Sequence, residues 1–170
     1  DWRLVSEKDA LSQTASYTYD ADGNRTMAVD KRGNVTRSRY DDRGSPLVIT
    51  DTLSVAHTFT YDSRNDLLTA TDGRGATTSH EYDGHSNLTK RTDALGGVTT
   101  LSYDGVGQLI SATDALGHPT SYNYDGYGNR VGVTDALGHT TSATYDSGGR
   151  QLSQTDALGQ TTSYAYDAAN

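Results

Sequence analysis

"YDGVGQLISATDALGHPTSYNYD", residues 103–125, contains one complete copy of a unit that recurs along the chain. A Tyr-Asp pair opens and closes the stretch, and an Asp-Ala-Leu-Gly run lies between the two pairs. Tyr-Asp returns every 21 residues without insertion or deletion, with its Tyr at positions 19, 40, 61, 82, 103, 124, 145 and 166. Self-similarity at a fixed period is typical of repeat architectures. The sequence therefore predicts an array of about eight similar units.

Each unit carries two turn motifs. The first, the Tyr-Asp turn, reads Tyr-Asp-x-x-Gly; the second, the Asp turn, reads Asp-x-x-Gly and begins at positions 9, 30, 51, 72, 93, 114, 135 and 156. Asp first and Gly fourth favour a type I turn, because the Asp carboxylate accepts backbone N–H bonds and Gly tolerates a positive φ. Ser12 and Ser54 replace the Gly of two Asp turns, and Asn65 and Ser86 replace that of two Tyr-Asp turns. We expect Asn to tolerate the positive φ better than Ser.

Segments of about six residues, rich in Thr, Tyr, Val and Leu, separate the turns. Their composition favours strands, and none of them has a helical period. Two turns per unit predict an all-β meander of consecutive antiparallel hairpins with roughly 16 strands. Open sheets rarely exceed about ten strands without curling. We therefore expect a sheet that curls into a spiral shell or cocoon wall. Residues 1–170 would form a single array with no separate domain, a fragment of a larger shell.

Alternation along the strands predicts one moderately apolar face and one wet face. The Tyr of each Tyr-Asp pair shares its face with the residue two positions earlier, while Ser, Thr and charged residues dominate the opposite face. On the other strand of each hairpin, an aliphatic column is expected to lie between the tyrosines of adjacent strands. This column contains Val5, Leu47, Leu68, Ile110, Val131 and Leu152.

Leucine occupies the third position in six of the eight Asp turns, although turn tips are usually polar. We expect this leucine rim to pack against another surface, such as the next coil of a spiralling sheet. The rim consists of Leu11, Leu53, Leu95, Leu116, Leu137 and Leu158.

The composition limits the classes of function. The 170 residues include 14 basic and 22 acidic side chains, which argues against nucleic-acid binding because that needs a basic surface. The absence of cysteine excludes disulfides and cysteine-based zinc sites. No apolar run is long enough for a transmembrane helix. Leu, Ile, Val and Phe together number 26, too few for one compact core, so a thin layered structure is expected. The chain begins with neither Met nor a signal peptide, and we interpret it as a piece of a longer protein.

Two features suggest a metal site, and both have a simpler explanation. Residues 20–24, DADGN, resemble the start of a calcium-binding EF-hand loop, but the later ligands and the closing Glu are missing. We interpret the periodic Asp residues as turn caps. His118 and His139 share one column in successive units, about 10 Å apart across two strands, which is too far for one metal ion.

No Ser-His-Asp order, paired-Glu cleft or phosphate-binding glycine loop stands out in the sequence. We predict that the chain is not an enzyme and has no catalytic, cofactor-binding or metal-binding residue. The regular positions of the repeat are expected to have structural roles only. They are Tyr61, Asp62, Asp93, Gly96, Tyr103, Asp104, Gly107, Asp114, Gly117, Tyr124, Asp125, Gly128, Asp135, Gly138, Tyr145, Asp146, Asp156 and Gly159.

The repeating unit resembles the Rhs or YD repeat family, and residues 103–125 match that pattern at every position. The resemblance covers the whole chain and is looser in the first units, where Arg25 and Pro46 replace Leu. It implies a long β-sheet that spirals into a hollow shell. In bacterial Rhs polymorphic toxins and in the BC components of insecticidal toxin complexes, this shell encloses a C-terminal toxin. Teneurins use a related shell in cell adhesion. The bacterial relatives release their toxin at an Asp-Pro autocleavage site, which this sequence lacks.

The resemblance implies a structural encapsulation module, a section of the shell around a toxin polypeptide. The toxin would be secreted or injected into target cells, for example by type VI secretion in bacterial competition. Expected partners are the rest of the shell, the enclosed toxin, and secretion-apparatus or toxin-complex proteins. We expect no nucleic acid partner and no membrane span. The alternative is an extracellular adhesion or carbohydrate-binding array.

Overall fold

The computed structural model describes residues 2–167, and this range consists of strands joined by turns, without a helix. None of the described residues forms a helix long and apolar enough to cross a membrane. The strands are β1 (Ser6–Lys8), β2 (Thr14–Tyr19), β3 (Arg25–Val29), β4 (Val35–Tyr40), β5 (Pro46–Thr50), β6 (Ala56–Tyr61), β7 (Leu67–Thr71), β8 (Thr77–Tyr82), β9 (Leu88–Thr92), β10 (Val98–Tyr103), β11 (Leu109–Thr113), β12 (Pro119–Tyr124), β13 (Arg130–Thr134), β14 (Thr140–Tyr145), β15 (Gln151–Thr155) and β16 (Thr161–Ser163).

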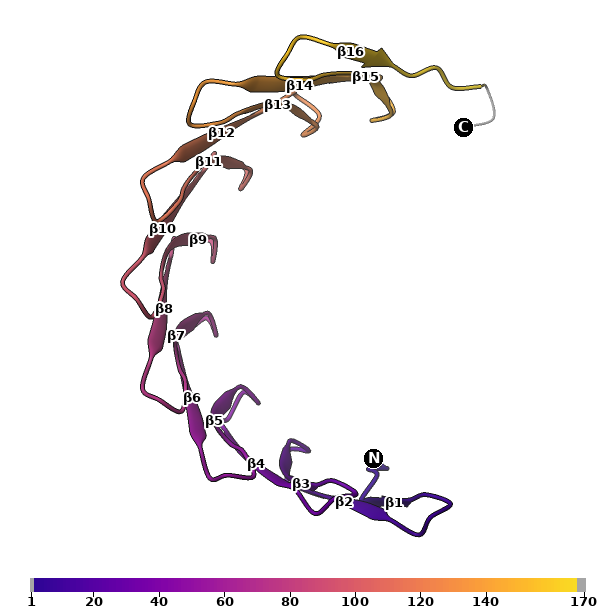
Figure 1. The fold of residues 1–170 in the computed structure, drawn as a ribbon, viewed down its shortest axis with the longest axis vertical. Coiled ribbons are helices and arrows are strands. Elements are labelled where there is room, and N and C mark those ends of the chain that lie inside the picture. Colours follow the sequence, from indigo (N-terminus) through magenta and orange to yellow (C-terminus); the bar gives the residue numbers. More distant parts are fainter. Residues whose placement is uncertain (1, 168–170) are drawn as a thin grey trace. The chain divides into compact units, whose positions relative to one another are not determined.

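The strands occur in the sheet in the same order as in the chain, β1 to β16, and Figure 1 shows the hairpins following one another along the ribbon. Paired neighbours run antiparallel. Tyr-Asp turns lead into the five-residue strands, and Asp turns lead back into the longer strands that end at Tyr. The predicted all-β meander of 21-residue repeats is therefore confirmed.

A β-bulge marks the Tyr end of the longer strands. Ser102 of β10 is opposite Ser111, but Tyr103 is opposite Leu109, so the register shifts between the two pairs. The turn after Tyr103 ends at a residue with positive φ, the geometry of a hairpin closed by a type I turn and a bulge. The same shift precedes Tyr19, Tyr40, Tyr61, Tyr124 and Tyr145.

The described chain divides into two compact units. One contains the residues up to His80 together with Asp93–Leu95, and the other contains Glu81–Thr92 and the residues from Gly96 onward. Within each of these two compact parts, the strands that contact one another are consecutive in the chain. Each part is therefore a single layer, built from contacts between neighbouring strands.

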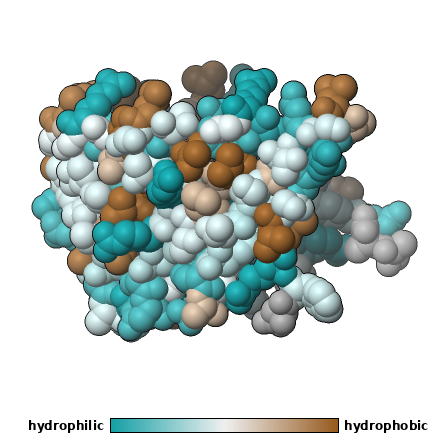
Figure 2. Space-filling view, turned by 90° about the horizontal axis from the view of Figure 1, so that it is seen from below, coloured by the Kyte–Doolittle hydropathy of each residue, from teal (hydrophilic) through white to brown (hydrophobic). Residues whose placement is uncertain are grey.

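A single layer leaves almost no interior. Among the described residues, Ala15 is the one buried hydrophobic side chain, at 3% exposure, and Ser45 is the one buried polar residue. Brown apolar groups lie scattered among white and teal ones in the face that Figure 2 shows. The strand faces are half-buried where the Tyr side chains lie and exposed on the other side, as in β10 and β12. The sequence was too poor in aliphatic residues for a compact core, and the fold needs none.

Two residues of the aliphatic column, Val5 and Leu152, lie opposite tyrosines, which are Tyr17 and Tyr164 and not tyrosines of Tyr-Asp pairs. Tyr17 donates its backbone N–H to the carbonyl oxygen of Val5, and Tyr164 donates to that of Leu152, both at 2.9 Å. The column is only partly covered, because Ile110 and Leu152 remain 40% exposed. The six leucines of the leucine rim are 79–98% exposed. The expected packing of this rim against another coil is not found within the residues that the structure describes.

Candidate functional site

The repeated turns are the candidate site, because they contain the residues that recur most strictly. In the Asp104 turn, carboxylate Oδ1 accepts the backbone N–H groups of Val106 and Gln108 at 3.0 and 2.9 Å. The carbonyl oxygen of Asp104 accepts the N–H of Gly107 at 3.1 Å, and its own N–H donates to the carbonyl oxygen of Gln108 at 2.9 Å. One Asp residue therefore holds the turn closed through its side chain and both of its backbone groups.

The structure places the other predicted Asp residues in the same role, with Oδ1 accepting the N–H two residues later. They are Asp62, Asp93, Asp114, Asp125, Asp135, Asp146 and Asp156. The predicted glycines stand at the fourth position of their turns, with φ between 81° and 88°. They are Gly96, Gly107, Gly117, Gly128, Gly138 and Gly159. The residues that replace glycine adopt the same left-handed conformation, with φ of 65° at Ser12, 63° at Ser54, 74° at Asn65 and 64° at Ser86.

The hydrogen bonds of the turns lower the pKa of several carboxyl groups. The backbone N–H groups of Ala76 and Arg74 hold the pKa of Asp72 below its ordinary value of 3.8. The backbone N–H of Arg150, followed by its guanidinium, lowers the pKa of Asp146 in the same way. These carboxylates are ionised at neutral pH, and their charge is used within their own turns.

Consecutive Tyr-Asp turns contact one another through the side chain that lies four positions after the Asp of each turn. Asn129 donates from Nδ2 to Oδ2 of its own Asp125 at 2.9 Å. Its Oδ1 lies beside Gly149 of the next Tyr-Asp turn, 3.6 Å from where a Cβ would be. Gln108 places its Nε2 3.0 Å from the corresponding point at Gly128. A Cβ at Gly128 would therefore be tight against the Gln108 side chain, whereas one at Gly149 would make an ordinary contact with Asn129.

The tyrosines of the Tyr-Asp pairs tie neighbouring strands together. The hydroxyl of Tyr103 donates to the carbonyl oxygen of Leu88 at 3.0 Å, and the hydroxyl of Tyr124 donates to that of Leu109 at 3.0 Å. Tyr145 makes the same bond to the carbonyl oxygen of Arg130 at 3.3 Å. Tyr61 has a raised pKa because of partial burial and the nearby charge of Asp41. Sequence reasoning assigned these tyrosines to a strand face but missed the bond, which depends on the strand register and on the bulge at the Tyr end of the strand.

The two histidines of the Asp turns bind within their own turns. Nδ1 of His118 lies 3.2 Å from Oδ2 of Asp114, and Nδ1 of His139 lies 2.9 Å from Oδ2 of Asp135. Both imidazoles are more than half exposed. In the part of the chain that the structure describes, no group of three or more His, Cys, Asp or Glu side chains is placed to hold a metal ion.

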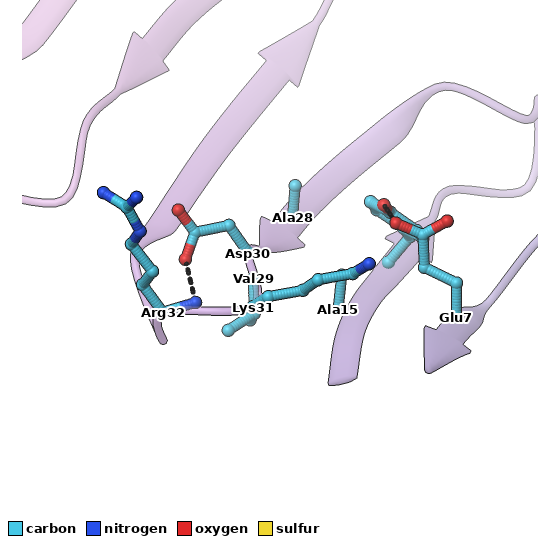
Figure 3. Close-up of a pocket in the computed structure, with 8 residues that line it drawn as sticks. Glu7, Ala15, Ala28, Val29, Asp30, Lys31 and Arg32 are labelled. Carbon is cyan, nitrogen blue, oxygen red and sulfur yellow. Dashed lines mark hydrogen bonds between the residues drawn. The ribbon is translucent and has the colours of Figure 1, made fainter. Parts of the chain in front are cut away.

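Shallow grooves lie on the tyrosine face beside the Asp turns. One has a volume of about 330 Å³ and a floor that includes Ala15 and Ala28. Figure 3 shows Lys31 extending across this groove toward Glu7, while Arg32 points the other way. A second groove of about 430 Å³ contains the His118 turn and the tip of the next Asp turn. Both follow from the geometry of the repeat, since they occupy equivalent places in two units.

The recurring polar side chains of this surface form hydrogen bonds within the chain. Each turn Asp from Asp9 to Asp156 accepts backbone N–H groups of its own turn, and the tyrosine hydroxyls described above donate to backbone carbonyl groups.

The amino-acid sequence matches the family model described as RHS Repeat over residues 3–35, 61–98, 103–140 and 145–170. These segments contain all the predicted structural repeat positions. Comparison with curated proteins gives no match.

Several solved structures share the fold. The Tc holotoxin pore of Photorhabdus luminescens matches 89% of this chain with a TM-score of 0.68 and 20% identity. The complex TcdB2-TccC3-Cdc42 matches 88% with a TM-score of 0.69 and 21% identity, and TcdB2-TccC3 matches 88% with a TM-score of 0.67 and 21% identity. The matched region covers 9%, 9% and 10% of those chains, so this chain spans about a tenth of their length.

Proposed function

The chain belongs to the RHS repeat family, and on this premise we propose that it is a section of wall in a hollow β-shell that encloses a toxin polypeptide. The single observation that supports this role is a sheet of regular hairpins with almost no buried side chain. A compact binding domain or enzyme needs a core to fix a site, whereas a wall needs only contacts between successive strands. The likeness in fold to chains of toxin complexes agrees with this proposal.

The wall would act without catalysis and without a cofactor. Its partners would be the rest of its own shell and the enclosed polypeptide, with proteins of a toxin complex or a secretion apparatus, including a type VI apparatus, at the stage of delivery. The parent protein would then act outside the cell that produces it, in competition between bacteria or against another host. The engagement of the turn carboxylates in their own turns supports a structural role.

Limited proteolysis of the complete parent protein tests the proposal. An enclosed polypeptide should resist a protease while the shell is intact, and it should be digested at once after mild denaturation opens the shell. Substitutions that abolish any activity of the enclosed polypeptide provide the control, because they should leave its protection from the protease unchanged. A parent protein without any segment that gains protection would contradict encapsulation. Specific retention of a glycan by the intact parent protein would favour the adhesion alternative instead.

A further inference from the structure

One Tyr-Asp turn already holds a guanidinium group. Arg43, the third residue of the Asp41 turn, donates from Nη1 to the carbonyl oxygen of Ser63 at 2.9 Å. It also donates from Nη2 to the carbonyl oxygen of Asp62 at 3.1 Å. These are the first two carbonyl groups of the next Tyr-Asp turn. Two N–H donors of one planar group thus contact two adjacent acceptors, a geometry that suits arginine better than lysine.

The Tyr-Asp turns at Asp125 and Asp146 have the geometry of the Asp62 turn. The bond from the fourth N–H to the Asp carbonyl oxygen is 3.1 Å at Asp62, 3.1 Å at Asp125 and 3.0 Å at Asp146. The fourth residues have φ of 74°, 88° and 79° in the same order. The three turns therefore share the closing hydrogen bond and the left-handed fourth residue.

Within residues 2–167, no arginine donates to the first two carbonyl groups of the two later turns, although Arg150 pairs with the carboxylate of Asp146 at 2.7 Å. Val106 and Tyr127 stand one turn earlier, at the position that Arg43 has relative to the Asp62 turn. No donor within residues 2–167 bonds to the carbonyl oxygens of Gly126 or Ser147. Gly126 and Ser147 are exposed, and Asp125 and Asp146 are half-buried.

We propose that the carbonyl pairs of Asp125–Gly126 and Asp146–Ser147 bind the guanidinium groups of arginine side chains from a partner polypeptide. Charge complementarity favours such a partner, because the chain has a net charge of −8. Tyr127 is 80% exposed and supplies an aromatic ring next to the second site, and arginine stacks on such rings. The chain itself contains this pairing, with Arg130 5.8 Å from the ring centre of Tyr122.

The Asp turns provide an internal comparison. Arg32 has the third position of an Asp turn, as Arg43 has in a Tyr-Asp turn, but no bond to a carbonyl group of the following Asp turn is found for it in the described range. The contact of Arg43 lies in the row of Tyr-Asp turns, where consecutive turns touch. Arg64, at the same position of the next Tyr-Asp turn, pairs instead with the carboxylates of Asp62 and Asp66 at 3.5 and 3.6 Å. The proposed binding of arginine needs only the Tyr-Asp turns and does not depend on whether the wall encloses a toxin.

Titration of the isotopically labelled full chain with a short acetylated peptide of alternating Arg and Gly tests the proposal by NMR. The backbone amides of Tyr127 and Gly148 follow the acceptor carbonyl groups, so they should shift with a dissociation constant in about the millimolar range. The matched Lys-Gly peptide should bind about fivefold more weakly, because an ammonium group lacks the planar fork of donors. The amides at the tips of the Asp turns, such as Leu116, should not move.

Two variants fill one site each from within the chain. Tyr127→Arg should abolish the peptide-induced shift at Gly148 and retain the shift near Gly126. Val106→Arg should do the reverse, so that each variant is the control for the other. Arg43→Gln should create a third responsive site, reported by the amide of Arg64. The proposal is overturned if the Arg-Gly and Lys-Gly peptides cause equal shifts, or if the amides of the Asp turns respond as strongly as those of the Tyr-Asp turns. It is also overturned if the shift at Gly148 survives Tyr127→Arg or the shift near Gly126 survives Val106→Arg.

Discussion

At the scale of the residue, a turn Asp caps its own turn by accepting backbone N–H groups. The sequence predicts this correctly, because Asp first and Gly fourth are the residues that a type I turn followed by a positive φ requires. Ser54 and Ser86 adopt the positive φ although serine tolerates it poorly, which shows that the hydrogen bonds of the turn dominate the local preference. The contact of Asn129 with Gly149 could not be predicted, since it joins residues almost one repeat apart.

Asp66→Asn should raise the stability of the chain. In the equivalent position Asn87 donates from Nδ2 to Oδ2 of Asp83 at 3.0 Å, whereas Asp66 has no proton to donate. Oδ2 of Asp66 is buried without a hydrogen-bond partner, and Nε of Arg64 lies 3.6 Å from it, beyond hydrogen-bond distance. An amide would complete the missing bond, worth about 0.5–1.5 kcal/mol. Thermal unfolding measures the effect, with Asp42→Asn, at an exposed turn tip, as the control of equal charge change. A lower Tm for Asp66→Asn would contradict this prediction.

Replacement of glycine by asparagine should cost more stability in a Tyr-Asp turn than in an Asp turn. Asparagine tolerates a positive φ, as Asn65 shows at 74°. At Gly138 the new side chain enters open space. At Gly128 it meets the Gln108 side chain, whose Nε2 is 3.0 Å from the Cβ position. Gly128→Asn should therefore cost about 1 kcal/mol more than Gly138→Asn in urea unfolding. Equal effects would show that the contact between turns adds nothing to the cost.

At the scale of the element, hairpin boundaries follow directly from the sequence. Turn residues at fixed spacing define where the strands end, and β-rich residues fill the segments between them. The bond from the Tyr124 hydroxyl to the carbonyl oxygen of Leu109 could not be derived in this way, because it depends on the register and on the bulge at Asn123 and Tyr124. Local preference thus predicts the hairpins, and the pairing geometry determines how they are joined.

Tyr124→Phe should destabilise the chain by about 1 kcal/mol, the usual net value of one hydrogen bond. The substitution removes the 3.0 Å bond to Leu109 and leaves that carbonyl group without its side-chain donor. Tyr127→Phe is the control, because its side chain is 80% exposed at a turn tip. Urea unfolding of both variants gives the comparison. Loss of stability in the control alone would refute the role assigned to the Tyr ties.

At the scale of the whole molecule, stability comes from contacts between successive strands. With Ala15 as the one buried hydrophobic side chain of the described range, no central core can dominate the free energy of unfolding. The sequence predicts this thinness from its few aliphatic residues. It could not predict that the leucine rim stays exposed within the described chain, since periodicity does not reveal what lies beyond a turn tip.

Acid should destabilise the array through many turns at once. The folded pKa values of Asp72, Asp83 and Asp146 lie below the ordinary value of 3.8. Depressed pKa values give stability that is present above the unfolded pKa and is lost as the pH falls through the folded pKa. Tm should therefore stay level above about pH 5 and fall progressively below about pH 4. Calorimetry across this range measures the change, and a Tm independent of pH down to acid would contradict it.

The double substitution Leu116→Ser and Leu137→Ser should affect the Tm of this chain and the Tm of the complete parent protein differently. Both side chains are 81% exposed, so the Tm of the 170-residue chain should not change measurably. In a parent protein whose coils pack rim to rim, the same change should lower the Tm. Differential scanning calorimetry of both proteins tests the two statements separately. An unchanged parent protein would show that the leucine rim has no partner there.

The constant step of 21 residues also has a genetic consequence. Because each hairpin contacts only its neighbours, removal or duplication of one whole unit leaves the flanking hairpins facing equivalent partners. Gain or loss of one whole unit, a step of 21 codons, can therefore change the length of the protein without interrupting the reading frame or the pairing of strands. The dimensions of the assembly can thus evolve by copy number, independently of any single substitution.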